Sequence, residues 1–283
     1  MQIDDQGDYA MPPVPMTDEQ KFFFDLRGWI LLPAVLTDER EIEEMKAEVN
    51  GGARQSYGPS LQRLLDHPAI VGILSEILAE DPFVRDECYG FRCEGSFTTV
   101  RPPGWDTSER GDNGLPHVVR PPQQANAMRY QVAGGKIFSG LTRVVWELEE
   151  VKSGQGATSF LSGSHKAHFN YGGPDRYRPN IDGSPWEESM RNMMDDYSCP
   201  PGSVVIFSES LMHAANSWTN PDNPRCAVFN CYNSIWAQWH RLNLSDEAIE
   251  TMPPRRRSLF RGVWAIGGPS GGNVEYAADN RSY

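Results

Sequence analysis

The chain has 283 residues, of which 39% are hydrophobic and 11% aromatic, so it can fill the core of one large domain. Its formal net charge of −12 argues against nucleic acid and anionic membranes as partners, because both repel a negatively charged surface. The N-terminal residues lack the apolar segment of a secretory signal, and no stretch reaches the roughly 18 apolar residues of a transmembrane helix, so we expect a cytoplasmic protein.

The first third of the chain reads as helical with one short strand. Thr17 is a suitable N-cap, because acidic residues follow it at the positive end of the helix dipole, and Gly28 is a suitable stop. His67-Pro68 interrupts the last helical stretch. In chain order we expect a flexible leader over residues 1–16, a helix over 18–28, a buried strand over 29–36, a helix starting at Thr37 and ending at Val49, and one or two helices over 61–78.

From about residue 83 the hydrophobic pattern changes to a period of two, which favours β-strands. The first strand contains Gly95, where a bend is expected. We expect strands over residues 91–100, 128–132, 136–138, 143–148, 157–161, 203–207 and 225–232, followed by partly helical segments over 236–240 and 244–252.

Helices followed by about eight short strands are typical of a mainly β domain with flanking helices, and specifically of a double-stranded β-helix, the cupin-like jelly roll. We expect one such domain over residues 17–265, with long insertions at 101–124 and 166–198, and a Gly-rich tail over 266–283. Loops of that length are often functional.

The five cysteines do not form a disulfide or zinc pattern. Their number is odd and no Cys-x-x-Cys pair occurs. Cys226 and Cys231 are five positions apart, so on one strand they point to opposite faces. We therefore expect reduced, buried thiols, as in a cytosolic protein.

Two residues around the last pair of strands carry the chemistry. His213 follows the first of these strands, and a neutral imidazole suits iron. Arg225 comes twelve positions later at the start of the second strand, and its planar guanidinium suits a small dicarboxylate. Among the other histidines, His117 ends the long loop and can enter a barrel, whereas His67, His165 and His240 are interpreted as capping or structural residues.

Four stretches, in this order and spacing, resemble the phytanoyl-CoA dioxygenase family of iron(II)/2-oxoglutarate oxygenases. They are residues 22–45, residues 143–166 with the distinctive text SGSHK, residues 200–218 with His213, and residues 223–233 with Arg225. The resemblance implies the cofactor iron(II) and the cosubstrates 2-oxoglutarate and O2. It also implies oxidation, by hydroxylation, of an unactivated C–H bond of a small molecule, with decarboxylation of 2-oxoglutarate to succinate.

The same resemblance assigns roles to individual residues. His117 and His213 correspond to the iron ligands, and Arg225 to the partner of the far carboxylate of 2-oxoglutarate. Asn216 and Ser217 are placed where they can orient either ligand.

The chain departs from the family pattern at one position. The family shows His-x-Asp, and here Val119 stands where the aspartate is expected. Either another acid completes the iron site, or two histidines and 2-oxoglutarate hold iron as in related halogenases, or metal binding is lost and the domain is a non-catalytic binding protein. Val119 is bulkier than the Gly or Ala of halogenases and would crowd a chloride. The candidate acids are Asp106, Asp112, Glu147 and Glu209.

The substrate itself is not identified by the sequence. Four arginines in and around the predicted barrel would suit an anionic or zwitterionic small molecule, and their alternative role is ordinary ion pairing with this acidic chain. They are Arg101, Arg120, Arg129 and Arg143. The sequence carries no signal for the oligomeric state.

Overall fold

The computed structural model describes residues 9, 11–52, 57–79, 88–107, 126–167 and 191–263. Parts of the predicted leader and of both insertions, and the whole of the predicted tail, lie outside these residues. The described part of the leader contacts the domain at a few points although residues 11–15 are exposed: Tyr9 is buried against His67, and the Val14 N–H donates to the Pro68 carbonyl oxygen at 3.0 Å.

The first helix, α1 (Asp18–Arg27), confirms the capping prediction. Thr17 and Gln20 form a reciprocal capping box, and Gly28 ends the helix in the left-handed conformation at φ 84°. Strand β1 (Trp29–Leu32) is shorter than predicted. The chain turns after it, because Pro33 cannot donate to a strand ladder and Ala34 has a φ of 48°.

The next helices match the prediction in type, but their bounds differ by two residues: the second helix begins and ends later than predicted, and the third begins earlier. Helix α2 (Glu39–Gly51) begins after Asp38 rather than at Thr37, because the Asp38 carboxylate accepts the Arg40 N–H at 3.0 Å. The predicted break at His67 is confirmed. The elements around it are α3 (Pro59–Gln62), η1 (Arg63–Leu65) and α4 (Pro68–Leu78).

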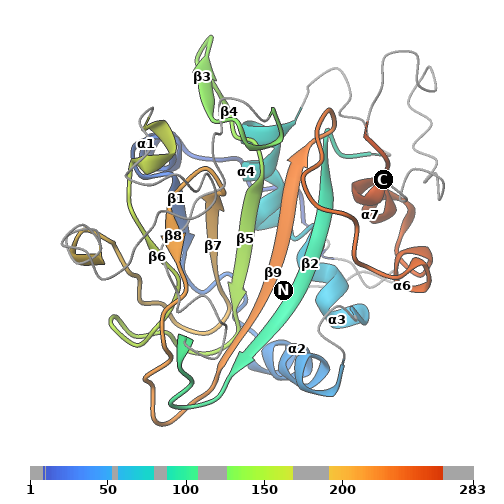
Figure 1. Ribbon diagram of the computed structural model, residues 1–283. Coiled ribbons are helices and arrows are strands. Elements are labelled where there is room, and N and C mark those ends of the chain that lie inside the picture. Colours follow the sequence, from blue (N-terminus) through green and yellow to red (C-terminus); the bar gives the residue numbers. More distant parts are fainter. Residues whose placement is uncertain are drawn as a thin grey trace.

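The main sheet has five antiparallel strands in the order β1-β7-β5-β9-β2 (Figure 1). Its register shifts between Cys93 and Gly95, which confirms the predicted bend. The remaining strands of this sheet are β2 (Phe91–Arg101), β5 (Thr142–Glu147), β7 (Ser203–Ser208) and β9 (Arg225–Ser234).

Two small sheets complete the described strands. One pairs β6 (Ser159–Phe160) with β8 (His213–Ala214), and the other is the hairpin of β3 (Gln131–Ala133) and β4 (Lys136–Phe138), which projects at the top of Figure 1.

Two local predictions are wrong. A strand was expected from Met128, but that residue ends the 3-10 turn η4 (Asn126–Met128), and residues 236–240 form no helix. The helical segments after β9 are α6 (Asp246–Glu250), α7 (Pro254–Arg257) and η6 (Ser258–Phe260), while η5 (Ser164–Lys166) precedes the second insertion.

The two faces of the main sheet are covered differently. On one face, side chains such as Val144 and Trp146 pack with buried residues of α1, α2 and α4. On the other face, Val145 and Phe229 pack with Phe160 of β6. A helix-covered sheet whose inner face meets a smaller sheet is the architecture of a jelly roll, so the predicted fold class is confirmed.

The sequence also predicts cysteines outside disulfides and no membrane-spanning helix. All five cysteines are buried thiols outside any disulfide, as predicted. Among the described helices, none is both long and apolar enough to cross a bilayer.

His67 is a buried helix cap rather than a surface residue. Its Nδ1 accepts the Ala69 N–H at 3.1 Å, and its ring lies between those of Tyr9 and Trp146 at 4.4 and 5.1 Å. Only 2% of the residue is exposed, and burial lowers the pKa of its imidazole to about 3. The ring is therefore neutral in the folded chain near pH 7.

We predict that His67→Asn flattens the pH dependence of stability in weak acid, while Asn keeps a capping oxygen. Below pH 6.5 the unfolded chain binds a proton here and the folded chain does not, so acid favours unfolding. As the pH falls, the free energy of unfolding of the wild-type chain should decrease by up to about 1.4 kcal/mol per pH unit more than that of the variant. Urea unfolding at pH 7 and pH 5 measures the free energy of unfolding of both proteins. Equal decreases in wild type and variant would contradict the prediction.

Candidate metal and cosubstrate site

A pocket of about 730 Å³ lies against the inner face of the main sheet. Its described lining combines aromatic rings with ionisable side chains and reaches Trp105 and Thr158. The lining residues that matter most here are Phe97, Arg101, Arg143, Glu209, His213 and Phe229.

His213 opens β8 and is held with one nitrogen toward this pocket. Its Nδ1 lies 2.8 Å from the Leu211 carbonyl oxygen, and a carbonyl can only accept, so Nδ1 carries the proton. Nε2 is then the acceptor of the neutral ring, and it lies 3.7 Å from Oε2 of Glu209. An imidazole fixed by a backbone carbonyl on one side is the usual arrangement of a metal-ligating histidine.

Glu209, which directly follows β7, is also paired with Arg143 of β5. Nε and Nη2 of Arg143 contact its Oε1 at 2.7 and 2.6 Å, whereas Oε2 is the oxygen that faces His213. Burial alone lowers the pKa of a guanidinium, but attraction to nearby acidic groups, among them the Glu209 carboxylate, outweighs it and raises the pKa of Arg143 above its ordinary value. The pocket therefore contains three neighbouring ionisable groups: Arg143 contacts Glu209, and Glu209 lies beside His213.

Arg225, the predicted cosubstrate residue, is fully buried beside the pocket. Its Nε contacts Oε2 of Glu147 at 3.2 Å, and its Nη2 pairs with Oε1 of the same carboxylate. The Tyr197 hydroxyl donates to that carboxylate at 2.6 Å. Burial alone lowers the pKa of Arg225, but the Glu147 carboxylate outweighs it and raises that pKa.

One nitrogen of Arg225 is left over. Nη1 is buried and has no hydrogen-bond partner among the residues that the structure describes. Nη2 lies 3.5 Å from the Thr158 hydroxyl, and Thr158 lines the pocket, so the guanidinium stands directly behind the pocket wall. A buried donor without an acceptor costs free energy, and a carboxylate oxygen would satisfy it.

Asn216 and Ser217 hold neighbouring segments together. The Asn216 amide donates to the Ala157 carbonyl at 2.6 Å and to the Ser159 hydroxyl at 3.1 Å. The Ser217 hydroxyl accepts the Thr107 N–H at 3.2 Å. Their direct contact with a cosubstrate stays a prediction.

The other predicted residues are placed as follows. His117, together with Asp112 and Arg120, lies outside the described residues, so its role as an iron ligand stays a prediction. Arg101 lines the pocket, as Arg143 does, and its guanidinium lies 4.5 Å from the centre of the Trp105 ring. Arg129 lines a different, smaller pocket of about 330 Å³.

Sequence reasoning did not identify the pocket's aromatic residues or the role of Glu147. Phe97 and Phe229 stack with ring centres 4.7 Å apart, and both line the pocket. The alternation of side chains along a strand could have indicated Glu147. Arg143, Val145 and Glu147 are two residues apart on β5, so their side chains lie on one face of the sheet.

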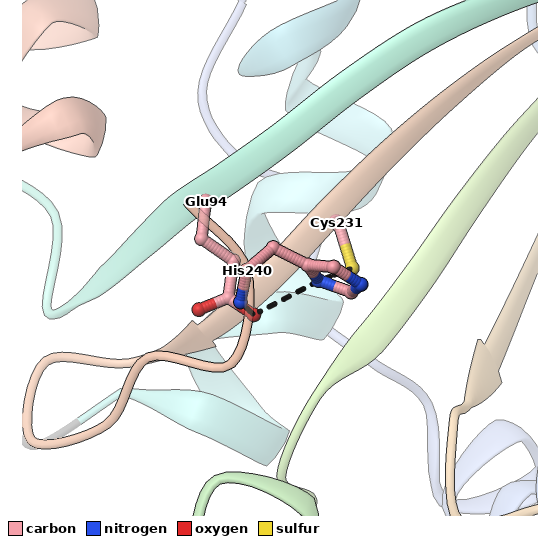
Figure 2. A group of neighbouring side chains, drawn as sticks. All are labelled: Glu94, Cys231 and His240. Atoms are coloured by element: carbon pink, nitrogen blue, oxygen red, sulfur yellow. Dashed lines mark hydrogen bonds and ion pairs between the residues drawn. The ribbon is translucent and has the colours of Figure 1, made fainter. Parts of the chain in front are cut away.

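A second group of metal-binding residue types comes from β2, β9 and the segment after β9 (Figure 2). It lies close to the pocket, because Cys231 is the strand partner of the pocket residue Arg143. It consists of Glu94, Cys231 and His240, with His240 Nδ1 at 3.5 Å from Glu94 Oε1 and 3.9 Å from Cys231 Sγ. The Glu94 carboxylate also accepts the Trp239 N–H at 2.9 Å. Burial raises the pKa of the Cys231 thiol well above its ordinary value, so the sulfur is protonated. The group fastens the segment after β9 to the bulge of β2, a structural role as expected for His240.

We predict that Glu147→Gln destabilises the fold by about 3–5 kcal/mol, because it leaves the buried Arg225 charge without a counter-ion. Glu150→Gln is the matched control, since Glu150 makes only a half-exposed ion pair with Lys152. Urea unfolding of both variants gives the two losses. Equal losses would show that Arg225 does not depend on Glu147.

The chain was compared with models of known protein families and with known proteins. Residues 34–227 match the family model of phytanoyl-CoA dioxygenase (PhyH). No curated protein matches the chain.

Solved structures give the same fold. Apo HygX from Streptomyces hygroscopicus is 16% identical, with a TM-score of 0.61 over 83% of this chain and 94% of that chain. HygX with nickel and 2-oxoglutarate bound has the same identity and TM-score over 82% and 93%. The epimerase SnoN, in complex with Fe3+, alpha ketoglutarate and nogalamycin RO, is also 16% identical, with a TM-score of 0.52 over 79% and 85%.

The structural matches establish the jelly roll, and the family match covers more than half of the chain and includes both His213 and Arg225. The chain therefore belongs to the phytanoyl-CoA dioxygenase family and is an iron(II)/2-oxoglutarate-dependent oxygenase.

Proposed function

We propose that the chain oxidises an unactivated C–H bond of a small-molecule substrate by hydroxylation and converts 2-oxoglutarate to succinate. The orientation of His213 carries this proposal, because its Nε2 acceptor faces a pocket that also contains a carboxylate. HygX, one of the similar structures, has been solved with nickel, 2-oxoglutarate and hygromycin B bound, which supports a small molecule as the substrate class.

The donors of the pocket fit iron(II). Imidazole and carboxylate are ligands of non-haem iron in oxygenases, and His213 supplies the imidazole. We assign the second imidazole to His117. Bound iron supplies, with 2-oxoglutarate and O2, an oxidant strong enough to take a hydrogen atom from a C–H bond.

Arg225 fits the far carboxylate of 2-oxoglutarate. Glu147 engages Nε and Nη2 and so fixes the guanidinium plane, while Nη1 is a buried donor that lacks an acceptor. A carboxylate entering past Thr158 would satisfy Nη1 and add a charge-assisted hydrogen bond. Arg225 thus binds and orients the cosubstrate without losing its counter-ion.

The substrate would occupy the remainder of the pocket. The stacked Phe97 and Phe229 rings offer an apolar surface, and Arg101 adds positive charge beside Trp105. Such a lining suits an anionic or zwitterionic molecule with an apolar part. Product mass measured with chloride present separates hydroxylation from halogenation on the same scaffold.

We predict that His213→Ala abolishes iron retention. His213 is the one histidine among the described residues that line the pocket, so no described imidazole replaces it. Metal content after anaerobic loading and desalting measures the effect, and His67→Asn is the matched control, because His67 packs against Trp146 on the opposite face of the sheet. Full iron occupancy in the His213 variant would remove this residue from the site.

We predict that Arg225→Lys raises the Kd for 2-oxoglutarate at least tenfold, about 1.4 kcal/mol, while iron binding is unchanged. Lysine keeps a positive charge opposite Glu147 but lacks the planar group that reaches two carboxylates. Calorimetric titration with 2-oxoglutarate measures the change, and Arg129→Lys is the control in the other pocket. An unaltered Kd would count against Arg225 as the cosubstrate residue.

A further inference from the structure

The metal site that the proposed function requires lacks its expected carboxylate. The acid normally two residues after the first histidine is replaced by Val119, a side chain that cannot bind metal. We propose that Glu209 supplies the carboxylate ligand instead, from the same turn that presents His213. This inference rests on the proposed function and specifies the ligand set of its metal site.

The turn between β7 and β8 brings the two side chains together. Its backbone is fixed by the Leu211 N–H, which donates to the Ser208 carbonyl at 2.9 Å, and by the Glu209 N–H, which donates to the Leu141 carbonyl at 2.8 Å. Glu209 and His213 leave its two ends and point into one pocket. Both side chains are at most 10% exposed, so their positions are set by packing.

The separation of the two donor atoms suits a shared ion. His213 Nε2 and Glu209 Oε2 are 3.7 Å apart. Adjacent ligands of an octahedral ion, each about 2.1 Å from it, lie about 3 Å apart. The observed separation is therefore only slightly longer than that of two adjacent ligands of one ion.

Arg143 prepares Glu209 for this role. It contacts Oε1 through two nitrogens, so the carboxylate is oriented with Oε2 toward His213. Ligating carboxylates are commonly held by hydrogen bonds of this kind from outside the metal's own shell. Arg143 also offsets the charge of a carboxylate that is only 6% exposed.

The other candidate acids fit less well. Glu147 is fully buried and already binds Arg225 and Tyr197. Asp106 is exposed. Asp112 lies outside the described residues. A metal site closed by Glu209 also has no vacancy for a halide, so it favours oxygen transfer over halogenation.

The test is iron(II) affinity, measured without turnover. Anaerobic calorimetric titration of Fe(II), and of Co(II) with its absorption spectrum recorded, compares wild type with Glu209→Gln. We expect an affinity loss of at least tenfold and an altered Co(II) spectrum, because a neutral amide replaces an anionic ligand. Glu150→Gln, on the surface, should match wild type in both measurements.

A purely structural Glu209 gives a different result. If this residue only neutralises Arg143, then Glu209→Gln lowers the melting temperature of the metal-free protein and leaves Fe(II) affinity and the Co(II) spectrum unchanged, which overturns the inference. If the single variant does not fold, the double variant Arg143→Met/Glu209→Gln removes both charges and is judged by the same two measurements.

The outcomes separate this inference from the proposed function. If Glu209→Gln binds Fe(II) as tightly as wild type while His213→Ala loses its iron, then Glu209 is not a metal ligand and the oxygenase proposal stands. Failure of the wild-type protein to bind Fe(II) at all removes both.

Discussion

The strand register of the main sheet is the constraint on which the site depends. Antiparallel pairing places Arg143 of β5 opposite Phe207 and Cys231, and Glu147 opposite Ala227. Arg143, Val145 and Glu147 therefore share the inner face of the sheet, while Trp146 packs into the helix-covered core. A shift of β5 by one residue would exchange its two faces and place the charges of Arg143 and Glu147 among the apolar side chains of the helices. Burying these charges would cost so much free energy that the register is strongly specified.

The inner face of the sheet carries two arginine–carboxylate pairs with different surroundings. The pair of Arg225 and Glu147 is sealed from solvent, and Tyr197 closes it. The pair of Arg143 and Glu209 borders the pocket, and the second oxygen of Glu209 faces His213. Buried pairs add little net stability, because desolvation offsets attraction. Their value here lies in placement: each holds one charged group in a fixed orientation beside the pocket.

Local signals in the sequence were enough for most elements. The N-cap at Thr17, the break at His67 and the bend at Gly95 were all predictable, because each depends on neighbouring residues. Errors arose where two local choices compete. Thr37 and Asp38 can both cap a helix, and only the structure shows that Asp38 does so. The segment from Met128 has strand-like residues but forms a 3-10 turn.

The site was predictable in its residue types but not in its pairings. His213 and Arg225 could be read from their strands, since a resemblance covers those stretches. The partner of Arg225 could not, because Glu147 lies 78 positions away and parity assigns only a face, not a neighbour. Four acids were equivalent candidates in the sequence. The fold distinguishes Glu209, which lies in the pocket, from Glu147, which lies behind its wall.

The loss of an aspartate at Val119 then has a physical rationale. In the His-x-Asp pattern, two ligands come from one short segment, here the one that contains His117. With Glu209 as a ligand, the carboxylate comes instead from the turn that presents His213, which is anchored to β5 through Arg143. Ligands on a rigid turn are ordered before the metal arrives, so less conformational entropy is lost on binding. In the proposed site, His117 is the one donor from its segment, so position 119 has no metal to bind and can carry the apolar side chain of Val119.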